Sequence, residues 1–280
     1  MPTLFARGFK SPTLFVAIVL FLALPTQAAL VRPSSSSNLI DDTEFFVTQH
    51  YLDFLNRPPD EEGLAFWMDN IESCGADTAC REVKRIDTSA AYFLSIEFQE
   101  TGYLVHRFYR ASFGRRPLFN EFLADTDLIS AGVVVNSPGW QELLESNKQS
   151  FAEAWVTRGS FSSVYDGLTN EQFVDTLIAN TEVTFTSTDR DSLVDVLNSE
   201  AFTRDQVLRL VAENFDFYNA EYNVAFVEME YFGYLRRDPD AAGFTFWLGK
   251  LNDFGGDFRR AEMVKAFIVS GEYRQRFGTP

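Results

Sequence analysis

The chain repeats itself, and this internal similarity constrains its fold more than any other feature of the sequence. Seven of the thirteen positions in residues 55–67 recur in residues 235–247, at a constant offset of 180. The shared residues are Leu55, Arg57, Pro59, Asp60, Gly63, Phe66 and Trp67, matched by Leu235, Arg237, Pro239, Asp240, Gly243, Phe246 and Trp247. Such self-similarity is typical of proteins that use one helical or sheet unit several times.

Apolar residues flank both segments at helical spacing. Before the first segment, Val47, Tyr51 and Phe54 lie at i, i+4 and i+7, which is one face of an amphipathic helix, and the same spacing precedes the second segment. Each unit is therefore predicted to run helix, Pro-Asp turn, helix, loop, helix, with the third helix ending over residues 92–98 or 267–273.

Residues of the turn have predicted roles at the helix ends. Proline disfavours helical geometry in the residue before it, so Pro59 and Pro239 are expected to stop the first helix of each copy. Asp60 and Asp240 are expected to cap the second helix. Ser95-x-Glu97-Phe98 and Ser270-x-Glu272-Tyr273 close the two copies, and the two glutamates are predicted to cap a helix end or a helix start.

Two weaker copies lie between the outer ones. Residues 114–117 echo the turn, residues 173–217 echo a whole unit, and residues 118–147 read as a long irregular insertion. The predicted fold class is all-α, with about four degenerate three-helix units packed as one or two helical domains. The predicted segments are a signal peptide (1–28), a Ser/Pro-rich linker (29–42), and four repeats (43–102, 103–165, 166–220 and 221–280).

The N-terminal segment predicts export. Arg7 and Lys10 precede an apolar run over residues 14–24, and Pro25-Thr26-Gln27-Ala28 follows, which is the layout of a signal peptide cleaved after Ala28. An uncleaved anchor is the alternative, although eleven apolar residues are short of the ~20 that span a bilayer. No membrane span is expected after cleavage.

The charge balance excludes one class of partner. The whole chain has 24 basic and 40 acidic residues, and residues 1–28 hold two of the basic ones and no acidic one. The remainder therefore carries 22 − 40 = −18, a charge that repels phosphate backbones and argues against nucleic-acid binding.

Cys74 and Cys80 are the only cysteines, and they fall where the first copy has five more residues than the last. In an exported chain, two cysteines within one inserted loop predict a disulfide. Zinc would need further ligands that the loop does not supply.

No catalytic, cofactor-binding or metal site is predicted. The two histidines, His50 and His106, are expected to be packed or half-exposed side chains of helices, and no nucleophile elbow, phosphate loop or dinucleotide motif accompanies them. Two pairs of carboxylates leave a calcium site open as an alternative: Asp125 with Asp127, and Asp189 with Asp191. Asp189 is otherwise expected to start a helix.

The motif resembles a bacterial family, the domain-of-unknown-function family 4214. The resemblance rests on Arg-x-Pro-Asp-x-x-Gly-x-x-Phe-Trp, closed about thirty residues later by Ser-x-Glu-Phe or Ser-x-Glu-Tyr, in both outer copies. The phrase at 108–115 is similar to the opening of another copy. The family looks related to phycobilisome linker domains, which implies an all-α fold, an interaction role and no assigned catalytic residue.

We therefore expect an exported, non-enzymatic binding or assembly module that is periplasmic, on the bacterial cell surface or secreted. Its partner would be an unknown protein or a surface polymer, held through aromatic-lined grooves. One alternative is a hydrolase or transferase that uses two carboxylates on an envelope glycan. The other is a calcium-dependent surface protein.

Overall fold

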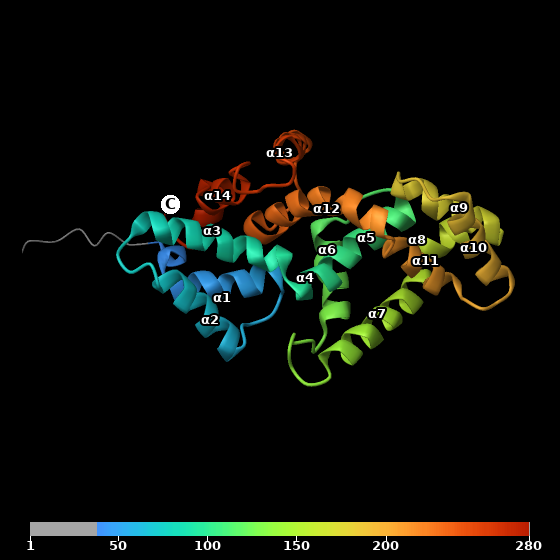
Figure 1. The fold of residues 1–280 in the computed structure, drawn as a ribbon, viewed down its shortest axis with the longest axis horizontal. Helices are drawn as coiled ribbons and strands as arrows, with labels where there is room; N and C mark the ends of the chain where they lie inside the picture. The colour runs from blue at the N-terminus through green and yellow to red at the C-terminus, as the bar shows by residue number, and fades with distance from the viewer. Residues whose placement is uncertain (1–37, 280) are drawn as a thin grey trace, which may run out of the picture. The chain divides into compact units, whose positions relative to one another are not determined.

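The computed structural model describes residues 38–279, and within them every regular element is helical, which confirms the all-α class (Figure 1). The predicted signal peptide and residues 29–37 of the predicted linker lie outside the described residues. The elements are η1 (Leu39–Asp41), α1 (Thr43–Phe54), α2 (Glu61–Glu72), α3 (Thr78–Leu94), α4 (Ile96–Glu100), α5 (Gly102–Phe113), α6 (Phe119–Ser130), α7 (Trp140–Val156), α8 (Gly159–Tyr165), α9 (Asn170–Thr181), α10 (Ser187–Asn198), α11 (Arg204–Ala212), α12 (Phe215–Glu230), the π-helical η2 (Tyr231–Leu235), α13 (Ala241–Asp253), α14 (Met263–Ile268) and α15 (Gly271–Gln275). Within residues 38–279, none of the helices combines the length and the hydrophobicity that a membrane crossing requires.

The first helix of each outer copy ends at a left-handed residue, not at the proline. Asn56 has φ 52° and Arg236 has φ 54°, three residues before Pro59 and Pro239. The expectation that proline stops these helices was wrong, because the chain has already left the helix when it reaches the proline. Asn favours left-handed geometry, whereas Arg rarely adopts it. Arg236 is held in place by a hydrogen bond from its Nη1 to the carbonyl of Asp53, at 2.9 Å.

The third helix of each copy is shorter than predicted. Helix α3 ends at Leu94 and α14 at Ile268, and Ser95 and Ser270 then adopt extended backbone and start a new short helix. Each serine Oγ accepts a hydrogen bond from the backbone N–H three residues later, at 3.1 Å. A serine at this position caps a new helix more readily than it continues an old one, because its side chain competes for backbone donors.

Residues 118–147 are mostly helical, so their description as an irregular insertion was wrong. They hold α6 and the start of α7, separated by a loop over residues 131–139. The carboxylate of Glu121 accepts from the N–H of Leu118 at 2.8 Å and so fixes the start of α6. Phe122, Ile129 and Leu144 are buried and hold both helices to the core.

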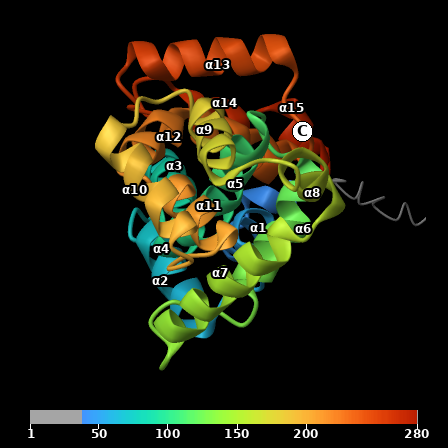
Figure 2. The same cartoon turned by 90° about the vertical axis from the view of Figure 1, so that its right-hand side faces the viewer.

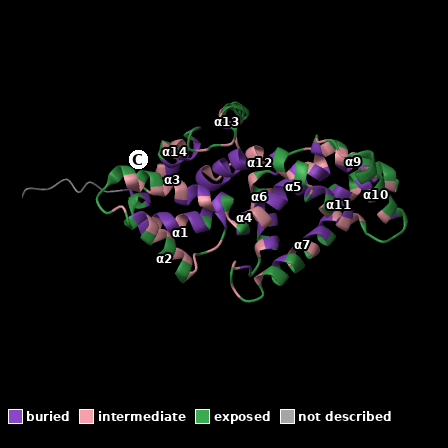
Figure 3. Cartoon of the chain, viewed as in Figure 1, coloured by how far each residue is buried: buried purple, intermediate pink, exposed green. Residues whose placement is uncertain are grey.

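The core is built around α5, in which ten of the twelve residues are buried (Figure 3). This helix packs against α4, α6, α9, α11 and α12. Helix α13 lies at the periphery beside α12 and α14 (Figures 1 and 2). Four aromatic side chains, each no more than 2% exposed, follow a break between helices at corresponding places in the chain: Phe98, Phe161, Phe217 and Tyr273. The division into four repeats remains a prediction.

Both ends of the described chain meet. The Asn38 side-chain amide donates to the carbonyls of Arg274 and Thr279, both at 2.9 Å. The Arg274 guanidinium holds both carboxylate oxygens of Asp41, at 2.8 and 2.9 Å. Residues 38 and 279 therefore lie side by side, joined by polar contacts.

Candidate functional site

The repeated motif forms a bidentate ion pair in each outer copy. Nε and Nη2 of Arg57 donate to the two carboxylate oxygens of Glu97, at 2.7 and 2.8 Å. Arg237 binds Glu272 in the same way, at 2.7 and 3.1 Å. The prediction that these glutamates cap a helix was wrong, since the preceding serine provides the cap. Each glutamate instead ties the start of a short helix to the Pro-Asp turn.

Asp60 and Asp240 cap α2 and α13, as their position after proline predicts. The carboxylate of each accepts from the backbone N–H of the glycine three residues later, at 2.8 Å. In the first copy the same carboxylate also lies 3.4 Å from Nη1 of Arg57. The aspartate is thus part of the ion-pair network as well as the helix cap.

A tyrosine that precedes the motif contacts both the motif arginine and the motif glycine. The guanidinium of Arg57 lies over the ring of Tyr51, 5.0 Å from its centroid, and Arg237 lies over Tyr231 at 5.3 Å. The tyrosine hydroxyl occupies the space that a Cβ on the motif glycine would need, for both Gly63 and Gly243. Glycine is required here by close approach of a side chain, since neither residue has a positive φ.

In each Phe-Trp pair the tryptophan packs against the core and the phenylalanine is exposed to solvent. Trp67 and Trp247 are half-buried and lie beside Tyr92 and Phe267, at 6.1 and 5.6 Å between ring centroids. The preceding residues, Phe66 and Phe246, are 62% and 59% exposed and stand edge-on to their tryptophans, at 4.9 Å in both copies. Each copy therefore presents one aromatic ring to solvent on a fixed support.

The motif residues of the two copies differ in their exposure to solvent. In the first copy, a pocket of about 290 Å³ is lined by six motif residues, and Val135 and Asn136 of the α6–α7 loop form part of its wall. The side chain of Glu97 is 4% exposed, whereas that of Glu272 is 49% exposed. The same contacts are thus partly enclosed in the first copy and open to solvent in the last. The six motif residues in the pocket are Arg57, Asp60, Gly63, Trp67, Ser95 and Glu97.

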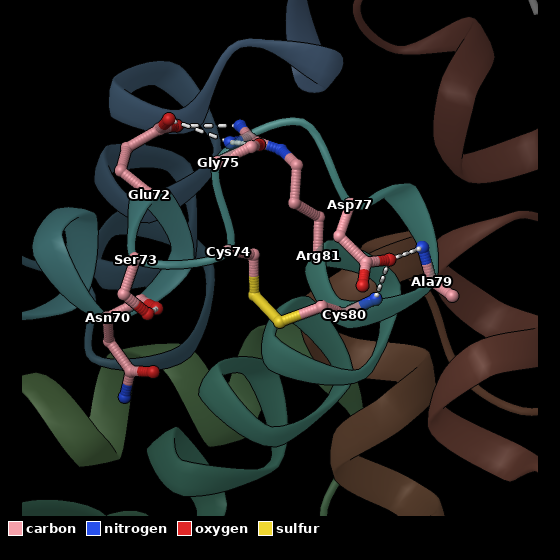
Figure 4. Close-up of a disulfide and its surroundings, with 9 residues drawn as sticks. All are labelled: Asn70, Glu72, Ser73, Cys74, Gly75, Asp77, Ala79, Cys80 and Arg81. Atoms are coloured by element: carbon pink, nitrogen blue, oxygen red, sulfur yellow. Dashed lines mark hydrogen bonds and ion pairs between the residues drawn. A yellow bond between two sulfur atoms is a disulfide. The ribbon is translucent and has the colours of Figure 1, made fainter.

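Cys74, in the loop between α2 and α3, meets Cys80 in the first turn of α3 (Figure 4). Their sulfur atoms lie at disulfide distance and their Cα atoms are 5.6 Å apart. The carboxylate of Asp77 accepts from the N–H of Cys80 at 3.0 Å and caps α3, while Arg81 reaches back to Glu72 at 2.6 and 2.7 Å. The loop is therefore fixed by the cysteine pair, a helix cap and an ion pair.

The structure contains a buried charged cluster that was not predicted from the sequence. His106 on α5 is 1% exposed, with Nε2 2.7 Å from Glu221 and Nδ1 2.6 Å from Glu228, both on α12. Burial disfavours the charged ring, but the two carboxylates outweigh it and raise the pKa of His106 above its ordinary value. Both ring nitrogens face carboxylate oxygens, and this arrangement favours the imidazolium form. The seven-residue spacing of the glutamates, which places them on one face of a helix, was the available signal.

His50 has the opposite environment. It is fully buried, with Nδ1 2.7 Å from the carbonyl of Phe46 and Nε2 2.8 Å from Oγ of Ser89. Burial lowers the pKa of His50 to about 3, so its ring is neutral at physiological pH. Of the two expected states, packed or half-exposed, both histidines adopt the packed one.

The carboxylate pairs considered for calcium do not converge. Both oxygens of Asp125 are held by Arg158, at 2.7 and 2.9 Å, and Tyr109 also donates to one of them. Asp127 accepts from Asn56 instead. Asp189 lies in the first turn of α10, whose cap is Thr186, and Asp191 contacts Arg190. Across residues 38–279, no three His, Cys, Asp or Glu side chains gather as metal ligands would.

The glycan hydrolase alternative requires two carboxylates facing one cleft. Glu228 and Asp238 do line one pocket, of about 490 Å³, together with Arg110, Arg115 and Arg116. Glu228, however, is bonded to His106, and Asp238 accepts from the N–H of Phe119 at 2.7 Å. Both carboxylates therefore already have partners within the fold.

Comparison with known proteins finds a match only for the last copy of the motif. Searches of curated proteins and of solved structures find no match to this chain. A family model, described as a domain of unknown function, matches residues 212–277, which hold α12, η2, α13, α14 and α15. This segment contains the open copy of the motif, from Arg237 to Tyr273. Residues 212–277 of the chain therefore match the model of the DUF4214 family.

Proposed function

We propose that this protein is an exported, non-enzymatic binding module that holds a protein or polymer partner in the periplasm or at the bacterial cell surface. The observation that carries the proposal is the pair of exposed rings, Phe66 and Phe246. A single exposed apolar side chain needs no explanation. The same ring at the same place in two copies, each against a tryptophan of the same geometry, is a repeated surface feature that packing of the core does not require.

The support beneath each ring suits binding. An aromatic ring buries a large area when a partner covers it, and it loses few degrees of freedom in doing so. The tryptophan beneath is held by the core, and the helix that carries both rings is capped by Asp60 or Asp240. The ring is therefore presented in one orientation, which lowers the entropic cost of binding.

The proposal is tested in the native host by cross-linking and mass spectrometry of whatever the protein captures, after cell fractionation. The double variant Phe66→Ser/Phe246→Ser is compared with wild type. The control is Phe215→Ser, which removes a ring that is 76% exposed but lies outside the Phe-Trp pairs.

We expect the double variant to lose the wild-type partner while the control keeps it, with all three proteins in the envelope or the medium. Capture of the same partner by the double variant, or recovery of the protein from the cytoplasm, would refute the proposal. Circular dichroism checks that the variants are folded.

A further inference from the structure

One pocket of this acidic protein is lined by an excess of cations. It has a volume of about 270 Å³. Its lining residues come from the first half of α3, from α14 and the residue after it, and from η1 and α15. Four basic side chains line it: Arg81, Arg85, Lys265 and Arg274. The net charge of the whole chain is −16, so a local cluster of this kind departs from the average surface.

Three of the four cations have carboxylate partners. Arg81 binds Glu72, Arg274 binds Asp41, and Lys265 lies 2.5 Å from Glu82. Arg85 has no carboxylate within ion-pair distance among the described residues. Four cations and three carboxylates leave one positive charge, 4 − 3 = +1, and it belongs to Arg85.

The guanidinium of Arg85 is fixed in position, but not all of its hydrogen-bond donors have partners. It stacks on the ring of Phe46, 3.8 Å from the centroid, and donates to the carbonyls of Ile40 at 2.5 Å and Asp41 at 3.4 Å. A guanidinium has five N–H groups, so three remain without a partner in the described structure. Nε of Arg85 donates no hydrogen bond in the described structure and is not a fully buried atom, so this N–H is accessible to a ligand. Burial lowers the pKa of Arg85, as expected of a cation without a counter-charge.

Part of the pocket wall is apolar. Ile86 and Ile268 are mostly covered, and Val269 stands at the rim, 55% exposed. A ligand that satisfies both parts of the wall needs one negative group for Arg85 and an apolar body against the isoleucines. A carboxylate matches a guanidinium in geometry, since two parallel N–H groups can bind its two oxygens.

We propose that this pocket binds an organic monocarboxylate with an apolar body, anchored on Arg85. Such a carboxylate belongs either to a free small acid or to the C-terminus of a peptide with an apolar last residue. The site is separate from Phe66 and Phe246, so the proposal does not rest on the proposed function.

Titration calorimetry with the folded protein tests the proposal. The probes are octanoate, 1-octanol, inorganic phosphate, and the tripeptide Gly-Gly-Leu with a free or an amidated C-terminus. We expect octanoate or the free tripeptide to bind, and the alcohol, phosphate and amidated tripeptide not to bind. Tighter binding of octanoate would indicate a free small acid as the ligand, and tighter binding of the free tripeptide would indicate a peptide C-terminus.

Two variants locate the binding. Arg85→Met keeps the apolar stem and removes the charge, and should weaken binding by about tenfold to a hundredfold, the value of a charge-assisted pair. Val269→Glu places a negative charge at the rim and should abolish binding. Val83→Glu is the matched control, because Val83 is 52% exposed but lines a neighbouring pocket instead.

The proposal is overturned if neither acid binds to wild type, or if Val269→Glu binds as well as Val83→Glu does. This second comparison holds even if Arg85→Met does not fold, because both valines are at the surface.

Discussion

The hydroxyl of Tyr51 lies where a side chain on Gly63 would have to be. Tyr231 stands in the same relation to Gly243, 180 residues later. In both copies the tyrosine ring is also covered by the motif arginine, which limits how far it can move. The motif glycine is therefore explained by a contact between two helices rather than by a turn.

Gly63→Ala and Gly243→Ala should each destabilise the fold by about 1–3 kcal/mol, the usual cost of overpacking. The tyrosine must shift, and the contact with arginine is lost. Gly249→Ala is the control, since nothing lies within 4 Å of its added Cβ and it is inside α13. That change should stabilise by about 0.5–1 kcal/mol. Urea denaturation measures all three, and equal effects would contradict the explanation.

The two ion pairs should differ in energy because they differ in exposure. Glu97→Gln removes the bidentate partner of the half-buried Arg57, which then has only Asp60 at 3.4 Å, and should cost about 2 kcal/mol. Glu272→Gln should cost less than about 1 kcal/mol. Double-mutant cycles with Arg57→Met and Arg237→Met give the two coupling energies. A larger coupling in the last copy would show that enclosure does not strengthen the pair.

His106 and His50 should give opposite pH dependences. The pKa of His106 is raised, so its stabilisation is complete below about pH 6.5, the unfolded value, and is lost as pH rises through the folded pKa. The pKa of His50 is lowered to about 3, so the protein loses stability as pH falls from about 6.5 toward 3. Each window has a slope of up to about 1.4 kcal/mol per pH unit.

Denaturation of wild type, His106→Gln and His50→Gln from pH 4 to 9 checks these signs. The advantage of wild type over His106→Gln should shrink above pH 6.5, and His50→Gln should lack the loss below it. A reversed order of the two slopes would mean that the protonation states are assigned wrongly.

Glu230 is buried, and its Oε2 has no partner in the described structure. Burial raises its pKa well above the ordinary value. The neutral form is favoured, so wild type should lose stability as pH rises above about 4.5 toward the folded pKa. Glu230→Gln removes this loss and should be the more stable protein at pH 8, with little difference at pH 4. Glu153→Gln, an exposed change on α7, should show no such pH-dependent gain over wild type.

Removal of the cysteine pair should have a modest effect. The sequence separation of six between Cys74 and Cys80 gives about 2 kcal/mol in the chain-entropy model. Cys74→Ser/Cys80→Ser should therefore unfold at lower denaturant and keep its circular dichroism spectrum. Wild type under reducing conditions should match the variant. Identical stability of oxidised wild type and the variant would show that the pair does not form a bond.

The sequence was sufficient where one residue acts on its own backbone neighbours. Asp60 and Asp240 follow proline at the start of an apolar pattern, so their capping role is a local matter. The all-α class follows in the same way, from spacing within single helices. The helical nature of residues 118–147 was missed because they carry no copy of the motif, although Phe122 and Ile129 lie seven apart on one face.

Contacts between distant residues could not be derived. Arg57 meets Glu97 across forty positions, and His106 meets Glu221 across more than a hundred. The local sequence around each glutamate is also compatible with an ordinary role, such as helix capping or exposure to solvent. Which role a glutamate has depends on how the helices pack. The enclosure of the first copy by residues 135 and 136 depends in turn on where α6 and α7 dock.

The meeting of residue 38 with residue 279 has a topological consequence. Because Asn38 is bonded to the backbone at Arg274 and Thr279, a few added residues can join the two positions without stretching the chain. A circular permutant with its new ends in the loop over residues 131–139 would keep every helix and every contact between them. The same adjacency lets the whole helical unit be inserted into a surface loop of a host protein, entering and leaving at one point.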